Sequence, residues 1–189
     1  MDTVTMFERA RETVLRETRL ALEGIDAESA ARFVEYILNA RKVFCTGVGR
    51  VLLSLQAFVK RLAHLGIDAH YVGEITEPAL TKDDLLITGS GSGESIFPLS
   101  ITKKAKQLGA AVVHIGSNPK SSMAEYTDLL VRIPVRTKLA LDDEIDSQQP
   151  MTSLFEQSLL LFGDSIARVL VEKKGLDLHK LWQYHANLE

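Results

Sequence analysis

The sequence predicts an α/β protein in which a parallel sheet of five strands is covered by helices on both faces, a three-layer αβα sandwich. Two observations predict this fold. From about residue 42 onwards, short apolar runs alternate with longer segments of helical spacing, and two of the apolar runs end abruptly in glycine-rich turns. Strands that alternate with helices in this way form a parallel sheet with helices packed against both faces.

The composition is typical of one soluble domain, which we expect to span residues 1–189. Hydrophobic residues make up 46% and charged residues 25% of the chain, and the formal net charge is −3. This charge gives no reason to expect nucleic acid or an anionic membrane as a partner. No apolar stretch approaches a membrane span, and the N-terminus lacks a signal-peptide pattern. The single cysteine, Cys45, fits a reducing cytoplasm and is expected to be a buried, inert thiol.

Two helices are expected before the first strand. Gly24 should end the first of them, and Asp26 can cap the second. In the first helix, Leu15 and Leu22 lie a heptad apart, together with Phe7 at helical spacing. We expect these apolar side chains to pack against partner subunits. A place in the core of the same chain is the alternative.

The rest of the chain follows the alternation in order. The five expected strands are residues 42–46, 69–72, 85–88, 111–115 and 129–133, and the helices between them are residues 50–65, 96–108 and 121–125. A polar stretch, residues 134–151, follows the last strand. A long helix should then run over residues 152–174 until Gly175, and a short C-terminal helix carries residues 181–187.

The most informative segment is the glycine- and serine-rich loop that follows the third strand. We expect Ser90, Ser92 and Ser95 to hold a phosphate together with the amides of Gly91 and Gly93. Glycine lets backbone amides approach a ligand closely, and the start of the next helix adds unpaired N–H groups. A nucleotide-binding P-loop would need a lysine after its glycine, so a terminal monophosphate suits this loop better. A solvated turn is the alternative.

The two glycine-rich turns belong at the same edge of the sheet. Both Gly47–Gly49 and Gly89–Gly93 directly follow expected strands. In open parallel sheets, ligands bind at the carboxyl ends of the strands, where the strand order reverses. The predicted fold and the predicted phosphate loop therefore agree.

Seven segments spread over nearly the whole chain resemble one family of sugar isomerases. The glycine-serine loop alone is typical of the whole SIS (sugar isomerase) superfamily, whereas the Gly-Glu-x-Thr-x-Pro segment, the Pro-Met-x-x-x-Phe-Glu segment and the terminal His-Ala-Asn are more specific. Together they resemble the 6-phospho-3-hexuloisomerases. The matching segments are Gly47-Val48-Gly49-Arg50, residues 61–66, 72–78 and 82–87, Ser90-Gly91-Ser92-Gly93-Glu94-Ser95, residues 149–156 and His185-Ala186-Asn187-Leu188.

This resemblance implies a flavodoxin-like SIS domain and an enzyme that interconverts D-arabino-hex-3-ulose 6-phosphate and D-fructose 6-phosphate. It also implies a homotetramer (or a dimer), no metal and no cofactor. The metabolic partner would be a 3-hexulose-6-phosphate synthase, which joins formaldehyde to ribulose 5-phosphate. The chain departs from the usual pattern at two places. Val51 and Leu52 stand where Ser-Gly usually follows Gly-Arg, and Thr152 stands where a glycine usually follows Pro-Met.

The reaction needs a base that takes a proton from C2 and returns it to C3 through a 2,3-enediol. Glu156 is the residue that we expect to act as this base, on the resemblance and on its position just after the polar stretch. An alternative comes from the residues alone. Ser153-Leu154-Phe155-Glu156 is also a capping box, in which Glu156 would only return a hydrogen bond to the start of the helix.

Two histidines are expected to help polarise the carbonyl or open a cyclic substrate, on the resemblance. His64 lies late in the first crossover helix, and its alternative is a satisfied core residue. His185 lies in the C-terminal tail, which could cross to the site of a neighbouring subunit or simply fray. His70 and His114 lie in strands and are expected to have no chemical role.

Further candidates surround the first glycine turn and the second strand. Gly49 and Arg50 are expected to contact phosphate or a sugar hydroxyl, although Arg50 is also typical of a surface cation at a helix start. Glu74 and Thr76 are expected to meet the substrate or a subunit interface. The acidic residues at 142–146 lack the spacing of a calcium loop and are expected to be solvated.

Two other functions stay open at this point. One is a related sugar-phosphate isomerase, such as an arabinose 5-phosphate isomerase, although the chain carries no appended regulatory domain. The other is a non-catalytic protein that binds a sugar phosphate, as in transcription regulators. Two helices alone precede the first strand, and no basic recognition helix is evident among them.

Overall fold

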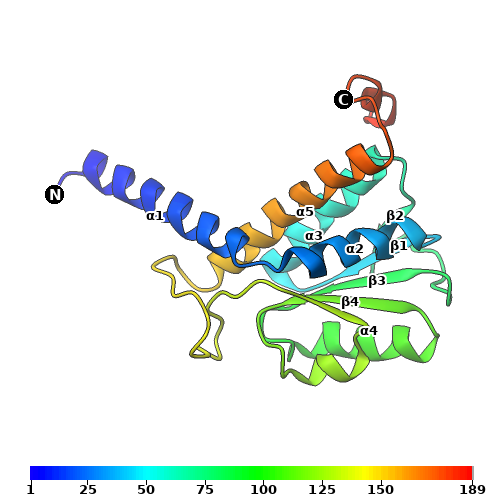
Figure 1. Ribbon diagram of the computed structural model, residues 1–189, viewed down its shortest axis with the longest axis horizontal. Coiled ribbons are helices and arrows are strands. Elements are labelled where there is room, and N and C mark those ends of the chain that lie inside the picture. The colour runs from blue at the N-terminus through cyan, green and yellow to red at the C-terminus, as the bar shows by residue number, and fades with distance from the viewer. Residues whose placement is uncertain (189) are drawn as a thin grey trace.

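The computed structural model describes residues 1–188 and confirms the parallel α/β fold (Figure 1). All strands of the sheet are parallel, and their order is β2-β1-β3-β4-β5. Each expected strand is present, with ends shifted by one residue at most. The strands are β1 (Val43–Thr46), β2 (Ala69–Tyr71), β3 (Leu85–Gly89), β4 (Ala111–Gly116) and β5 (Leu129–Arg132).

Helices cover both faces of the sheet, as Figure 1 shows. The helices α2, α3 and α5 pack over one face, whereas α4 and the 3-10 helix η1 lie under the other. The expected helix at 121–125 is thus a 3-10 helix. The helices are α1 (Thr3–Glu23), α2 (Ala27–Asn39), α3 (Gly49–His64), α4 (Ile96–Gln107), η1 (Ser122–Tyr126), α5 (Ser153–Lys173) and η2 (Lys180–Tyr184).

The central strands are mostly apolar because both of their faces are covered. All residues of β1 and β3 are buried, and successive side chains of β1 point to opposite layers. Val43 and Cys45 belong to the core under α2, α3 and α5, and Phe44 belongs to the smaller core over α4. Cys45 is fully buried, and this burial raises the pKa of its thiol, as expected for an inert cysteine.

Helix α1 projects from the body of the molecule and leaves much of its apolar surface exposed (Figure 1). Its buried residues are Glu17, Thr18 and Ala21. Phe7 is 65% and Leu15 60% exposed, so these two side chains are not part of the core of their own chain. The alternative of a place in that core is therefore wrong for Phe7 and Leu15 but correct for Leu22, which is half-buried and packs against the main core. Packing of the exposed side chains against partner subunits stays a prediction. As expected, Asp26 caps α2 and Gly24 ends α1.

The polar stretch between β5 and α5 is held by two carboxylates. Glu17 of α1 accepts hydrogen bonds from the Ser147 hydroxyl, at 2.7 Å, and the Gln148 amide, at 3.0 Å. Glu144 accepts one from the Ser117 hydroxyl at 2.8 Å. The other acidic residues at 142–146 are exposed, as the sequence predicted, so Glu144 alone departs from that expectation.

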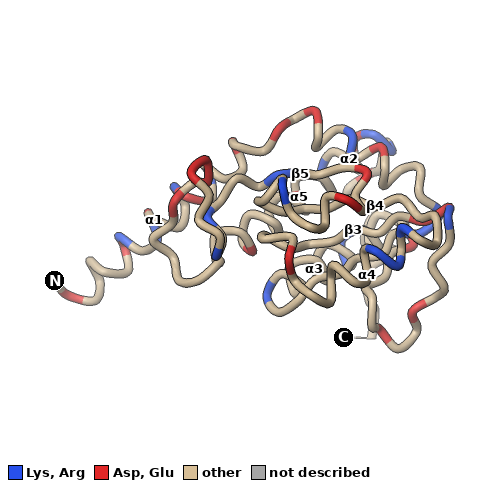
Figure 2. Tube along the Cα trace, turned by 90° about the horizontal axis from the view of Figure 1, so that it is seen from below, with Lys and Arg blue, Asp and Glu red and all other residues tan. Residues whose placement is uncertain are grey.

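The charged residues are mixed over the molecule. Figure 2 shows acidic and basic positions interspersed along the chain, in keeping with the formal net charge of −3. No helix within residues 1–188 is both long and apolar enough to cross a membrane.

Candidate active site at the carboxyl edge of the sheet

The strand order reverses between β1 and β3, which start the two halves of the sheet. One glycine-rich turn follows β1 and the other follows β3, as the sequence predicted. Gly49 begins α3 with a φ of +57°, a left-handed conformation that favours glycine. The loop at 90–95 follows β3 directly and leads into α4. This is the place where ligands collect in sheets of this topology.

The serine loop is compact, and its hydroxyl groups bind its own backbone. The Ser90 hydroxyl accepts a hydrogen bond from the Gly93 amide at 3.1 Å and donates one to the Ser95 hydroxyl at 3.2 Å. The Ser92 hydroxyl accepts from the Glu94 amide at 3.3 Å. The structure therefore brings the three predicted serines into one turn.

Amide groups at the start of α4 are available to an anion. Ser95 is the N-cap of this helix, and its side chain makes no capping hydrogen bond. The amides of Ile96 and Phe97 in the first turn have no hydrogen-bond partner among residues 1–188. Unpaired N–H groups and the helix dipole favour a bound phosphate at such a position. The geometry agrees with the phosphate site that the sequence predicted.

A buried histidine supports the serine loop from behind, a role that the sequence analysis missed. Nε2 of His114 in β4 donates a hydrogen bond to the Ser90 carbonyl at 2.8 Å. Burial lowers the pKa of His114 to about 4, so the ring is neutral at neutral pH. Gly93 turns against Ser121, and a Cβ atom added at Gly93 would lie 2.3 Å from the Ser121 side chain. The loop thus rests on a fixed and close-packed support.

A carboxylate and a guanidinium group meet where α3 and α5 begin. Nε of Arg50 contacts Oε2 of Glu156, and the Thr152 hydroxyl donates to Oε1 at 3.0 Å. The Glu156 side chain is 10% exposed, whereas that of Arg50 is 63% exposed. The first turn of α5 also stabilises the negative charge, because the positive end of a helix dipole lies there.

The capping box that the sequence allowed is not formed. Thr152 is the N-cap residue, and α5 begins at Ser153, one position earlier than a box with Ser153 as its cap requires. The amide of Glu156 donates to the Thr152 carbonyl at 3.2 Å, and its carboxylate turns toward Arg50. Glu156 therefore does not return a hydrogen bond to the start of its helix.

Ser54 links the two helices of this site and could not be singled out from the sequence. Its hydroxyl lies 2.9 Å from the Glu156 carbonyl and 3.2 Å from the Arg50 carbonyl. Only the packing of α3 against α5 brings these groups together. A hollow of about 210 Å³ opens beside them, lined by Arg50, Leu53, Ser54, Ala57, Glu156, Gln157 and Leu160.

Packing also joins this carboxylate to the serine loop. A Cβ atom at Gly91 would lie 3.6 Å from the ring of Phe155, the neighbour of Glu156. A Cβ atom at Gly89 would lie 2.8 Å from Val51, the neighbour of Arg50. Val51, which replaces the usual serine, thus packs against the base of the loop as an apolar side chain.

Among the described residues, Glu74 pairs with a histidine and not with Arg50 or Glu156. Oε1 of Glu74 lies 2.5 Å from Nδ1 of His70, and the His70 ring contacts Phe44 on the α4 face of the sheet. Thr76 is exposed in the turn that follows β2. The His70 ring, for which no role was expected, therefore orients Glu74.

The two predicted histidines lie together, but at the far end of α3. The rings of His64 and His185 stack with centroids 5.4 Å apart, and Trp182 lies beside them. Fourteen residues of helix separate Arg50 from His64, or about 21 Å at the usual rise per residue. Figure 1 shows the C-terminal segment at this distant end of α3. Within one chain the histidines therefore do not reach Glu156.

The surroundings of His64 disfavour the charged form of its ring. Burial lowers the pKa of His64, and the nearby charges of Lys60 and Arg61 act in the same direction. Its Nε2 atom is buried and has no hydrogen-bond partner among the described residues. A hollow of about 420 Å³ beside it is lined by Arg61, His64, Leu65, Leu178, Leu181, Trp182 and His185.

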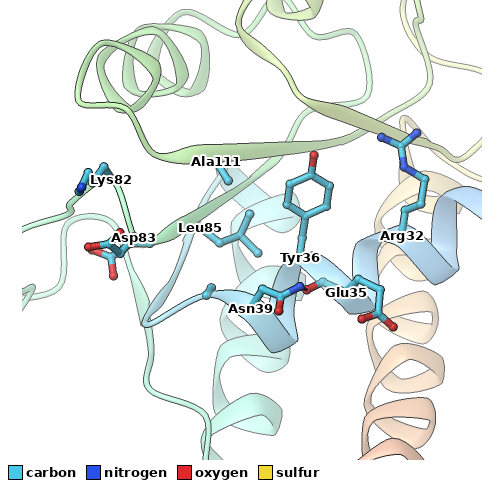
Figure 3. A pocket seen from close by; sticks show the side chains of 10 residues that line it. Arg32, Glu35, Tyr36, Asn39, Lys82, Asp83, Leu85 and Ala111 are labelled. Carbon is cyan, nitrogen blue, oxygen red and sulfur yellow. Dashed lines mark hydrogen bonds between the residues drawn. The ribbon is translucent and has the colours of Figure 1, made fainter.

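A larger hollow, of about 530 Å³, lies at the opposite edge of the sheet (Figure 3). Residues of α2 and the amino ends of β3 and β4 form it, with Tyr36 between Arg32 and Leu85 in this view. Because its walls belong to the amino ends of the strands, it is separate from the serine loop and from Glu156.

Comparisons with known proteins identify the family of this chain. Residues 36–162 match the SIS domain family. The chain is 42% identical to the 3-hexulose-6-phosphate isomerase of Bacillus subtilis over 93% of its own length and 95% of that protein. It is 34% identical to the 3-hexulose-6-phosphate isomerase of Mycobacterium gastri, over 87% of this chain and 82% of the other.

A solved structure is similar over almost the entire chain. It is the crystal structure of a Methanococcus jannaschii protein from which the function of a 3-hexulose-6-phosphate isomerase was inferred. The TM-score is 0.82 at 30% sequence identity, and the alignment covers 96% of this chain and 99% of the other.

Proposed function

This chain belongs to the SIS-domain family and, within it, to the 3-hexulose-6-phosphate isomerases, and we propose that Glu156 is the base of its reaction. The substrate pair is D-arabino-hex-3-ulose 6-phosphate and D-fructose 6-phosphate. The proposal rests on one observation. The same edge of the sheet holds both a loop suited to phosphate and a carboxylate that is shielded from solvent.

The phosphate fixes the sugar, and the carboxylate moves the proton. We assign the phosphate to the loop formed by Ser90, Ser92 and Ser95 and to the free amides at the start of α4. Binding energy from this distant group holds the reacting carbons in place. Glu156 then takes the proton from C2, while the electrons of that C–H bond form the C2–C3 double bond and the C3 carbonyl oxygen gains a proton. Loss of the O2 proton and return of a proton to C3 complete the isomerisation.

Arg50 controls access to this carboxylate. Its guanidinium group occupies Oε2 of Glu156 while most of the arginine side chain is exposed. An incoming sugar phosphate offers Arg50 competing oxygen atoms, so the arginine can move to the substrate and free Oε2. A guanidinium group has enough donors to bind such oxygens in more than one geometry.

A glutamine at position 156 tests this assignment. We expect Glu156→Gln to lower kcat by about 10² to 10⁴, because the amide cannot accept the proton. Glu172→Gln on the exposed part of the same helix is the matched control, since Glu172 contacts only Arg168 at 2.8 Å. Conversion of hexulose 6-phosphate is followed as fructose 6-phosphate. Near-normal turnover by a folded Glu156→Gln protein would refute Glu156 as the base.

The histidine pair is proposed to complete the site of another subunit. In one chain His64 lies about 21 Å from Arg50 along α3, and the ring of His185 stacks on it. The two rings, with the buried Nε2 atom of His64, nevertheless form a polar group beside a hollow. A neutral imidazole there could polarise the sugar carbonyl.

Mixing two inactive variants distinguishes the two arrangements. Glu156→Gln and His64→Gln subunits, unfolded and refolded together in equal amounts, should regain roughly a quarter of wild-type activity if each site combines two chains. Half of the sites then hold an intact glutamate, and half of these an intact histidine. No regained activity would mean that both groups act within one chain.

The remaining proposals concern assembly and context. The exposed Phe7 and Leu15 of α1 support a homo-oligomer, either the tetramer or the dimer that the resemblance implies. We also propose a cytoplasmic enzyme that takes its substrate from a 3-hexulose-6-phosphate synthase and so serves formaldehyde assimilation in the ribulose monophosphate pathway. Light scattering tests the first proposal. A coupled assay with the synthase, formaldehyde and ribulose 5-phosphate tests the second.

A further inference from the structure

We propose that Thr152 is a positioning residue that fixes the carboxylate of Glu156 while Arg50 moves to the substrate. The inference rests on the proposed function of Glu156 as the base. It concerns a residue at which this chain departs from the pattern that it resembles, where glycine usually follows Pro-Met. Glycine has no hydroxyl group and could not make the contact described below.

Two contacts connect Thr152 to Glu156. The Thr152 hydroxyl donates to Oε1 at 3.0 Å, and the Thr152 carbonyl accepts from the Glu156 amide at 3.2 Å. The first contact holds the end of the side chain and the second holds its backbone. Together they leave the glutamate little freedom to change its side-chain conformation.

The division of the two oxygens explains why the hydroxyl matters. Oε2 contacts Arg50, whose side chain is 63% exposed and therefore free to follow an anion. When Arg50 leaves, Thr152 remains as the side-chain donor to this carboxylate among the contacts that the structure shows. It keeps Oε1 in place, so that Oε2 stays directed toward the space that Arg50 has left.

A hydrogen bond to a charged carboxylate is also stronger than one to a neutral acceptor. Its loss should therefore lower kcat with little change in KM, because Thr152 contacts the base and not the phosphate loop. A side chain that served the stability of the loop alone would leave kcat unchanged in the folded enzyme.

Three variants separate these roles. Thr152→Val keeps the shape and removes the hydroxyl group, Thr152→Ser keeps the hydroxyl, and Thr152→Ala removes both hydroxyl and methyl. For Thr152→Val and Thr152→Ala we expect kcat to fall about tenfold to a hundredfold, the usual effect of one hydrogen bond to a charged group. KM should change little.

Thr152→Ser should restore most of the wild-type rate. The positioning role is overturned if Thr152→Val or, should that variant not fold, Thr152→Ala keeps the wild-type kcat, or if KM rises while kcat stays the same. It is also overturned if Thr152→Ser is as impaired as Thr152→Val. Glu156→Gln, measured beside them, separates the two proposals. An inactive Glu156→Gln with a normal Thr152→Val refutes the positioning role alone, whereas an active Glu156→Gln refutes the base itself.

Discussion

Replacing Gly93 by alanine should damage the phosphate loop more than a similar change at any other left-handed glycine of this site. Gly93 has a φ of +68°, and a Cβ atom there would lie 2.3 Å from both Cβ and Oγ of Ser121. The left-handed conformation costs a non-glycine residue about 1–2 kcal/mol. Displacing Ser121, which is buried, adds about 1–3 kcal/mol of overpacking. We therefore expect Gly93→Ala to lower the free energy of unfolding by about 2–5 kcal/mol.

Two other glycines provide matched controls. Gly49 has a φ of +57° and Gly175 one of +60°, and an added Cβ atom would meet no atom within 4 Å at either position. Each alanine variant should lose about 1–2 kcal/mol from backbone strain alone. Gly175 follows α5, so its variant should keep normal activity. Urea unfolding at one temperature measures all three free energies.

The clash itself is tested by removing the side chain that it involves. Ser121→Gly in the Gly93→Ala background should recover about 1–3 kcal/mol, the part that comes from overpacking. If Gly93→Ala loses no more stability than Gly49→Ala, or if Ser121→Gly recovers nothing, the reasoning from close packing is refuted. KM for the sugar phosphate should rise in Gly93→Ala, because the loop moves.

Three further predictions concern other parts of the fold. Burial lowers the pKa of His114 from 6.5 to about 4. As the pH falls, the unfolded chain therefore binds a proton at this residue before the folded chain does. The free energy of unfolding should drop by up to roughly 3 kcal/mol between those two pH values. Urea midpoints of His114→Gln should depend less on pH over that range, and an equal dependence would contradict this cause. Glu17→Ala should lower the free energy of unfolding in urea by about 1–3 kcal/mol, because the loop at 134–151 loses its hydrogen-bond acceptor. The same change should make this loop more sensitive to protease, and an unchanged cleavage rate would contradict the reasoning. Leu15→Lys should leave the free energy of unfolding of the subunit nearly unchanged but dissociate the oligomer in light scattering, and an intact oligomer would argue against α1 as an interface.

The fold could be predicted from the sequence because each strand is short, apolar and bounded by turn residues. The buried runs of β1 and β3 and the glycines after them mark the centre of the sheet and its ligand-binding edge. Helical spacing in α1 was less informative about packing. Leu15 follows the helical period but is exposed, because the same pattern results from packing within a chain or between chains.

The serine loop could be predicted for the same reason, since its residues are consecutive in the chain. The surroundings of Glu156 could not. Ser54 contacts its backbone because α3 and α5 begin side by side, and nothing in either segment indicates the other. The local sequence even favoured a capping box, which a shift of one residue in the start of α5 rules out. Such contacts depend on how the elements pack against one another, and the periodicity of the sequence does not indicate that packing.

The position of Cys45 has a consequence for the chemistry around this protein. The chain has one thiol, and it lies at the centre of the sheet with no exposed surface. Electrophiles attack the thiolate form, and burial raises the pKa of this group and so depletes that form. Formaldehyde readily forms adducts with accessible sulfur nucleophiles. An enzyme proposed to work next to formaldehyde fixation thus presents this toxic aldehyde with no sulfhydryl to modify.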